Sequence, residues 1–256
     1  MATAPIARPT GRTSNGGATS CHNKESSEGA GRRRVPKRHH HMKLFDTIAS
    51  TLRPGSYIIQ FSPIRTGSTL IFNILSDLFP KKRIKKTHTY DEAYGRLRTI
   101  CTIRHPLDCI VSTIKTKREL KLTPEQVFRQ SVAEFDDSGI RDIIRMVDQP
   151  NTLIFKYEEF LEDLDPVFDR IEAAFGRKIP EPERARIKEK QSIDAVASRA
   201  SALGEFSNWD PVTKLHGNHI SDTKGRPDVY KTFFTQEQIT ELEERYGDVL
   251  DKFGYR

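Results

Sequence analysis

The sequence has few cysteines and no long apolar run, the features that mark disulfide-rich proteins and membrane-spanning proteins. Its 256 residues include only 3 cysteines, and Cys101 and Cys109 flank one predicted strand and helix, so no disulfide framework is expected and both thiols should be buried. No apolar run approaches the roughly 18 residues that a membrane span needs. We therefore expect a cytoplasmic protein without a membrane span.

The first 42 residues have few large apolar side chains and only two acidic ones, Glu25 and Glu28. Such a segment cannot bury enough surface to offset the entropy of ordering, so we expect residues 1–42 to be a disordered basic tail. A leader rich in Arg and Ser and poor in acid is also typical of an organellar transit peptide, and this alternative stays open. The histidines at 39–41 have no fourth ligand at metal-site spacing, so no metal site is expected.

The formal net charge of +7 would attract polyanions, but part of the excess lies in the tail. The other basic residues cluster near predicted strand ends and are not spread with aromatics over one face, so nucleic-acid binding is not expected. Residues 43–256 are numerous enough to form one domain with a sizeable core.

After residue 43 the chain alternates between strand and helix patterns, which predicts an α/β fold with a parallel sheet between helices. Strands are expected over 56–61, in a short segment ending near His88, over 97–103 and over 152–157. Helices are expected over 70–78, 106–115, 124–135, 165–175, 182–190 and 236–253. Thr123 and Gln126 predict a capping box. Ligands bind at the carboxyl ends of parallel strands, where Arg65, His88, Arg104 and Tyr157 fall.

The most informative segment runs from a strand into a helix through a polar turn, Ser62-Pro63-Ile64-Arg65-Thr66-Gly67-Ser68-Thr69-Leu70. The first amides of a helix have no partner within the helix and converge on an anion. Gly67 allows close approach of the backbone, and Ser68 and Thr69 add hydroxyl donors. The turn lacks the first Gly and the Lys of a nucleoside-triphosphate P-loop, which argues against a kinase.

Four segments in order resemble the sulfotransferase family. Arg65-Thr66-Gly67-Ser68-Thr69 is similar to its 5′-phosphosulfate loop, and Lys86-Thr87-His88 to its K-x-H segment. Arg104-His105-Pro106, with Ser112 eight positions after Arg104, is similar to its 3′-phosphate element. Thr223-Lys224-Gly225-Arg226, followed by Phe234-Thr235, resembles its C-terminal R-K-G stretch. Together they span most of the chain after residue 50.

The resemblance implies a fold like that of the P-loop NTPases and in-line transfer of a sulfuryl group from 3′-phosphoadenosine-5′-phosphosulfate (PAPS), leaving 3′,5′-ADP (PAP), without a metal. It implies that His88 is the general base, that Arg65 stabilises the leaving oxygen and that Lys86 lies against the sulfuryl oxygens. The implied donor contacts are Arg65, Thr66, Gly67, Ser68, Thr69, Arg104, Ser112, Tyr157, Lys224, Gly225 and Arg226.

The sequence departs from the family pattern at three positions. Tyr90 stands where the family often has Pro, Leu70 where many members have an adenine-stacking Trp, and Thr223 where the first Arg of the C-terminal stretch is usual. Arg226 would then supply the missing charge.

Two other functions stay open, a kinase-like phosphotransferase and a nucleotide-binding protein without catalysis. Arg104 could also merely pair with Asp108.

The family places the acceptor between variable loops, here residues 89–96 and 192–217, the second with Phe206, Trp209 and His216. A small phenol, alcohol or amine is the first expectation, and a sugar or a peptide tyrosine stays open. His216 and His219 are reserve candidates for the base.

Overall fold

The computed structural model describes residues 57–117, 121–218, 220 and 223–256. The predicted tail, the three histidines at 39–41, Cys21 and His219 lie outside the described residues. Within the described part of the chain no helix is both long and apolar enough to cross a membrane.

A four-stranded parallel sheet forms the centre of the domain, in the order β2-β1-β3-β4. Its strands are β1 (Tyr57–Phe61), β2 (Arg83–Thr87), β3 (Arg98–Ile103) and β4 (Thr152–Lys156). β1 and β3 occupy the middle and are almost wholly buried, in keeping with their sequences YIIQF and RTICTI, in which only Arg98 is charged. The predicted parallel α/β sheet is confirmed.

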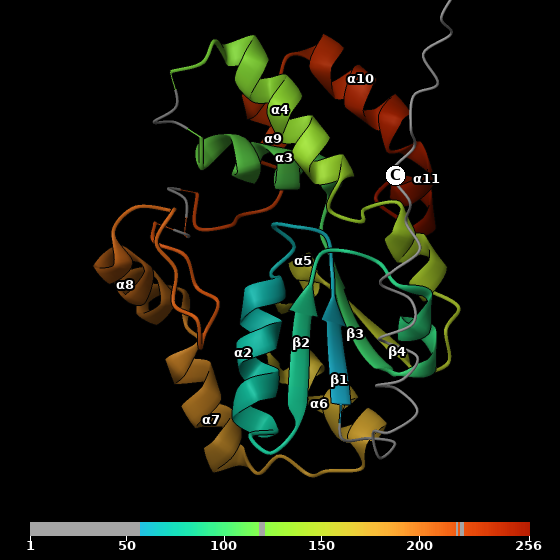
Figure 1. Cartoon of the computed structure of the whole chain (residues 1–256), viewed down its shortest axis with the longest axis vertical. Helices are drawn as coiled ribbons and strands as arrows, with labels where there is room; N and C mark the ends of the chain where they lie inside the picture. Colours follow the sequence, from blue (N-terminus) through green and yellow to red (C-terminus); the bar gives the residue numbers. More distant parts are fainter. Residues whose placement is uncertain (1–56, 118–120, 219, 221–222) are drawn as a thin grey trace, which may run out of the picture. The chain divides into compact units, whose positions relative to one another are not determined.

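Helices cover both faces of this sheet (Figure 1). They are α2 (Ser68–Leu78), α3 (Pro106–Lys115), α4 (Pro124–Asp136), α5 (Tyr157–Phe160), α6 (Asp165–Phe175), α7 (Glu181–Lys190), α8 (Ile193–Leu203), α9 (Tyr230–Phe233), α10 (Gln236–Arg245) and α11 (Gly247–Lys252), with 3-10 turns at Glu92–Arg96 and Asp142–Met146. Ile58 and Ile100 pack with α2 and α6, whereas Ile59 and Cys101 pack with α3, α4 and α11. The alternation of side chains along each strand thus supplies two cores.

The predicted C-terminal helix over 236–253 is wrong in one respect, because it is two helices joined at Tyr246. Tyr246 leaves the helical conformation (φ −111°, ψ 19°), its ring is fully buried against Phe135, and its hydroxyl donates to Asp136 (3.0 Å). The tertiary contacts of this ring outweigh the helical pattern. The capping box of Thr123 and Gln126 is confirmed at the start of α4.

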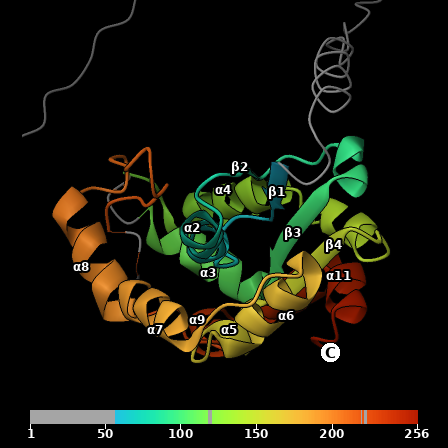
Figure 2. The ribbon, with the colours of Figure 1, turned by 90° about the horizontal axis from the view of Figure 1, so that it is seen from below.

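The carboxyl ends of the strands meet at one edge of the sheet, over which α3, α4 and α9 lie (Figure 1). α2 lies between the strands and the consecutive helices α7 and α8, as the view from below also shows (Figure 2). Helices therefore surround the sheet edge where ligands are expected to bind.

Candidate active site

The predicted anion-binding loop, residues 62–69, joins β1 to α2 at this edge. Gly67 is the residue before α2 and has φ +79°, a left-handed conformation that glycine adopts without strain. A Cβ atom there would come within 2.7 Å of the Tyr157 ring. Ser68 and Thr69 line the cavity at the first turn of α2. The start of this helix is thus open to an anion.

The Thr66 side chain differs from its prediction as a donor contact. Its hydroxyl donates to the carbonyl of Pro63 (2.8 Å) and shares a hydrogen bond with Thr102 (2.7 Å), and the residue is fully buried. Thr66 therefore ties the loop to β3 and does not present its hydroxyl to the cavity.

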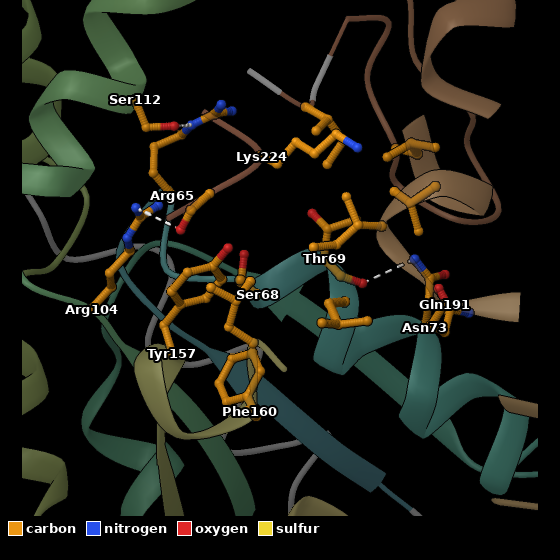
Figure 3. Close-up of a pocket in the computed structure, with 18 of the residues that line it drawn as sticks. Arg65, Ser68, Thr69, Asn73, Arg104, Ser112, Tyr157, Phe160, Gln191 and Lys224 are labelled. Carbon is orange, nitrogen blue, oxygen red and sulfur yellow. Dashed lines mark hydrogen bonds between the residues drawn. The ribbon is translucent and has the colours of Figure 1, made fainter. Parts of the chain in front are cut away.

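Arg65 projects from the same loop toward α3 (Figure 3). Its Nε donates to Oγ of Ser112 (2.9 Å), and its guanidinium lies 5.5 Å from the ring centroid of Phe206. Burial, followed by the positive charge of Arg104, lowers the pKa of Arg65 to about 10. Arg65 thus remains a cation at neutral pH.

Lys86 and His88 lie at the end of β2, and their side chains meet. Nε2 of His88 is 3.2 Å from Nζ of Lys86, and Nδ1 of His88 is 2.6 Å from the carbonyl oxygen of Ser62. Because a carbonyl only accepts, Nδ1 carries the hydrogen, and the electron pair of the unprotonated Nε2 accepts the hydrogen bond from the Lys86 ammonium. Burial and then Lys86 lower the pKa of His88 to about 4, and burial and then Arg65 lower the pKa of Lys86 to about 8.

Arg104 at the end of β3 is only 5% exposed and is held by the C-terminal segment. Its Nη2 donates to the carbonyls of Gly225 (3.1 Å) and Arg226 (3.0 Å), and its guanidinium lies 4.5 Å from the Tyr157 ring centroid. Asp108 is 4.0 Å away from Arg104. Among the described side chains, Nε of Arg104 is buried without a hydrogen-bond partner. Arg104 thus retains a donor for an anion, and its pairing with Asp108 is not its main contact.

The residues Lys224, Gly225 and Arg226 close this end of the site. A Cβ atom on Gly225 (φ +75°) would come within 2.0 Å of the Tyr157 hydroxyl, and Lys224 pairs with Asp194 (3.1 Å). Arg226 lines a neighbouring cavity of about 430 Å³ and not the main one. The predicted replacement of the missing family Arg by Arg226 is therefore not seen in this arrangement.

One cavity of about 820 Å³ joins the predicted residues, with Arg65 and Arg104 on one side and Thr69, Asn73 and Gln191 on the other (Figure 3). Its lining includes all the predicted site residues except Thr66 and Arg226. A cavity of this volume is large enough for a nucleotide together with a small second molecule.

Only one of the two predicted acceptor loops lines the cavity. Residues 192–217 contribute Phe206 and His216 to the lining, whereas none of residues 89–96 lines the cavity. Tyr90 instead packs edge-on against Phe61 in the core, which accounts for an aromatic residue at that position. Trp209 is half exposed and lies outside the lining. His216 stacks on Phe206, with ring centroids 4.7 Å apart.

Sequence reasoning missed the part of the wall formed by Lys188 of α7 and by Gln191, and it expected a loop over 192–217, where Ile193–Leu203 instead form α8 and contribute Ile193 and Arg199. It also missed Asn73, whose Nδ2 donates to the carbonyls of Thr69 (2.9 Å) and Thr213 (3.0 Å). A single amide among the apolar residues of α2 was the available signal for Asn73. Lys188 and Gln191 belong to no motif, and only the fold brings them here. Among the described residues no cluster of His, Cys, Asp or Glu is placed to hold a metal ion.

A parallel α/β sheet with an anion-binding loop at its carboxyl edge defines a P-loop-like class of nucleotide-binding protein. The chain belongs to the sulfotransferase family, because the family model described as "Sulfotransferase domain" matches residues 73–254. The matched segment begins after residues 62–69, so the assignment of that loop rests on its geometry. The prediction of a sulfotransferase-family enzyme is confirmed. No curated protein matches the chain.

Solved structures show the same fold. Mouse sulfotransferase SULT7A1 complexed with PAP matches with a TM-score of 0.61 and 16% identity, over 82% of this chain and 89% of that one. Retinol dehydratase in complex with androsterone and inactive cofactor PAP matches with a TM-score of 0.59 and 16% identity, over 81% of this chain and 84% of that one.

Proposed function

We propose that this enzyme transfers a sulfuryl group from PAPS to a hydroxyl or amine, with His88 as the general base. The observation that carries the proposal is the meeting in one cavity of three elements: the loop bearing Arg65, an imidazole whose Nε2 is unprotonated, and the cradle formed by Arg104 and Gly225. The PAP held by the two structural neighbours supports the choice of donor.

The unpartnered Nε of Arg104 and the close approach of Gly67 and Gly225 to Tyr157 fit a nucleotide with a 3′-phosphate. Arg104, Ser112 and Lys224 would hold that phosphate, and Tyr157 would contact the adenine. Gly67, Ser68 and Thr69 would surround the 5′-phosphate at the start of α2.

When bound, PAPS supplies a sulfuryl group whose bond to the phosphate oxygen breaks as a bond from sulfur to the acceptor atom forms. His88 accepts the acceptor's proton on Nε2, so that the product is the sulfate monoester anion R–O–SO₃⁻ or the sulfamate anion R–NH–SO₃⁻, with no extra proton left on the bridging oxygen or nitrogen. Arg65 and the amides of α2 stabilise the negative charge on the leaving oxygen. Lys86 neutralises charge on the sulfuryl oxygens.

The acceptor is proposed to be a small molecule that reaches His88 past apolar side chains, Ile64, Phe206, Leu215 and Ile220. The androsterone in the retinol dehydratase structure supports an alcohol of this kind. The cytoplasmic location stays a prediction.

The test is thermal unfolding with 3′,5′-ADP, 5′-ADP or ATP with Mg²⁺, because a ligand that binds only the native state stabilises it. Selective stabilisation by 3′,5′-ADP is expected. A preference for ATP with Mg²⁺ would instead favour a kinase-like phosphotransferase. If 3′,5′-ADP binds but no acceptor is sulfated, the protein is a nucleotide-binding protein without catalysis.

A further inference from the structure

Glu158 connects the chain at Arg104, which faces the proposed 3′-phosphate position, with the chain at Tyr157, the proposed adenine contact. It follows Tyr157 after β4, and its Oε1 accepts the backbone N–H of His105 (3.0 Å), the residue after Arg104. The guanidinium of Arg104 in turn lies over the ring of Tyr157. One carboxylate therefore joins the ends of β3 and β4 directly beside the cation and the ring of the donor site.

The second oxygen of this carboxylate is held by the C-terminal segment. Tyr255 donates its hydroxyl to Oε2 of Glu158 (2.9 Å), and the backbone N–H of Tyr255 donates to the carbonyl of Leu250 (2.8 Å). Burial, followed by the negative charge of Glu158, raises the pKa of Tyr255. The phenol therefore keeps its proton at neutral pH and remains a donor.

The His105 ring completes this cluster. It stacks on Tyr230 with ring centroids 4.4 Å apart and meets Tyr255 edge-on at 5.2 Å. Burial lowers the pKa of His105 to about 4, so a neutral ring occupies this site. The backbone N–H of Tyr230 donates to Asp108 on α3 (3.1 Å). We call Tyr255, Glu158, His105 and Tyr230 the Tyr255 latch.

We propose that the Tyr255 latch is a positioning network that directs Arg104 at the 3′-phosphate of the donor and so sets the preference for nucleotides carrying that phosphate. This inference rests on the proposed function. Charge-assisted hydrogen bonds are directional, so a small rotation of the Arg104 backbone weakens them. Tyr255 does not line the cavity and acts only through Glu158 and His105.

The test compares Tyr255→Phe with a matched control, Tyr246→Phe. Tyr246 is another C-terminal tyrosine whose hydroxyl donates to a carboxylate, that of Asp136 (3.0 Å); it is fully buried, whereas Tyr255 is partly buried, and it lies outside the latch. Calorimetric titration gives the dissociation constants of 3′,5′-ADP and 5′-AMP for each protein. We expect Tyr255→Phe to weaken 3′,5′-ADP binding roughly 3- to 30-fold. Binding of 5′-AMP, and of both nucleotides to Tyr246→Phe, should change less than about twofold.

Glu158→Gln serves as a second variant, because it keeps an acceptor oxygen but removes the charge on which both donors converge. This variant should reduce the preference for 3′,5′-ADP over 5′-AMP while the Tyr255 hydroxyl is still present. Thermal unfolding without nucleotide verifies that each variant folds.

The proposed role of the latch would be overturned if Tyr255→Phe kept the wild-type preference for 3′,5′-ADP over 5′-AMP. It would also be overturned if the variant bound both nucleotides more weakly by the same factor. The same loss of preference in Tyr246→Phe would also overturn it, because the effect would then be one of general stability. If the wild-type protein does not prefer 3′,5′-ADP to 5′-AMP, the donor assignment itself fails and the latch falls with it. This failure can be distinguished from a failure of the latch, because it is seen with the wild-type protein before any variant is measured.

Discussion

His88 and Lys86 share one hydrogen bond, and their surroundings decide which of them carries the charge. Burial lowers the pKa of both, to about 4 for His88 and about 8 for Lys86. Between these two values the imidazole is neutral and the ammonium is charged. A base and a cation are therefore available together across neutral pH.

The pH dependence of kcat/KM should reflect these two groups. Protonation of His88 removes the Nε2 electron pair that would accept the proton, so the acid limb should lie near pH 4 and not near the ordinary value of 6.5. Deprotonation of Lys86 removes its charge, so activity should fall above about pH 8. In Lys86→Met the loss of a nearby positive charge raises the pKa of His88, and the acid limb should move to higher pH. An acid limb that stays in place in this variant would contradict their electrostatic coupling.

Substitution of His88, the proposed base, should separate catalysis from donor binding. His88→Ala should lower turnover about 10²- to 10⁴-fold, the usual contribution of a general base, while the affinity for 3′,5′-ADP stays the same. His216→Ala is the matched control, since His216 lines the same cavity. A larger loss of turnover in His216→Ala than in His88→Ala would assign the base to His216. Steady-state kinetics and nucleotide titration provide both readouts.

At the scale of elements, two glycine-containing turns are shaped around one aromatic ring. Gly67 and Gly225 both have positive φ, and both approach Tyr157 too closely for a Cβ atom. Glycine is needed at these turns for the backbone conformation and for the space at the ring.

Gly225→Ala should therefore weaken 3′,5′-ADP binding, because the methyl group would collide with the Tyr157 hydroxyl beside Arg104. Gly176→Ala is the control: it also has positive φ, but none of the described atoms lies within 4 Å of the added Cβ. Both variants should lose about 1 to 2 kcal/mol of stability from the strained backbone. Only Gly225→Ala should lose nucleotide affinity, and equal affinity in the two variants would count against the cradle.

Most elements could be predicted because their sequence patterns are local. The buried strands β1 and β3 are rich in β-branched and aromatic residues with Arg98 as their single charged residue, and the capping box of Thr123 marks the start of α4. The break at Tyr246 could not be predicted, since Tyr is compatible with a helix and the break follows from burial of the ring against Phe135. The prediction that residues 89–96 belong to the acceptor site was wrong for a similar reason. Tyr90 in this segment packs on Phe61, and such a contact between distant segments cannot be recognised from a local pattern.

At the scale of the whole molecule, Asp108 connects parts of the chain that are far apart in sequence. It is almost fully buried on α3, and its carboxylate accepts the backbone N–H groups of Asp228 (2.8 Å) and Tyr230 (3.1 Å). These two bonds attach the segment with Lys224 and Gly225 to the sheet edge. Asp108 thus couples the donor site to the stability of the domain.

Asp108→Ala should lower the free energy of unfolding by about 2 to 5 kcal/mol, because it leaves two backbone donors without their acceptor. It should also weaken 3′,5′-ADP binding, as the C-terminal segment loses its attachment. Asp108→Asn keeps one acceptor oxygen and should lose less of both. Urea unfolding and nucleotide titration measure the two effects, and equal behaviour of the Asn and Ala variants would argue against this role.

The sequence by itself determined the parallel α/β fold, the family and the groups that end the central strands, since each depends on residues close together in the chain. Tertiary structure decided the rest of the site. The Thr66 hydroxyl bonds to Pro63 and Thr66 does not line the main cavity, Arg226 lines a neighbouring cavity and not the main one, and α7 contributes to the wall of the site. The physical reason is that side-chain direction and long-range contact depend on packing between distant segments, which no local pattern records.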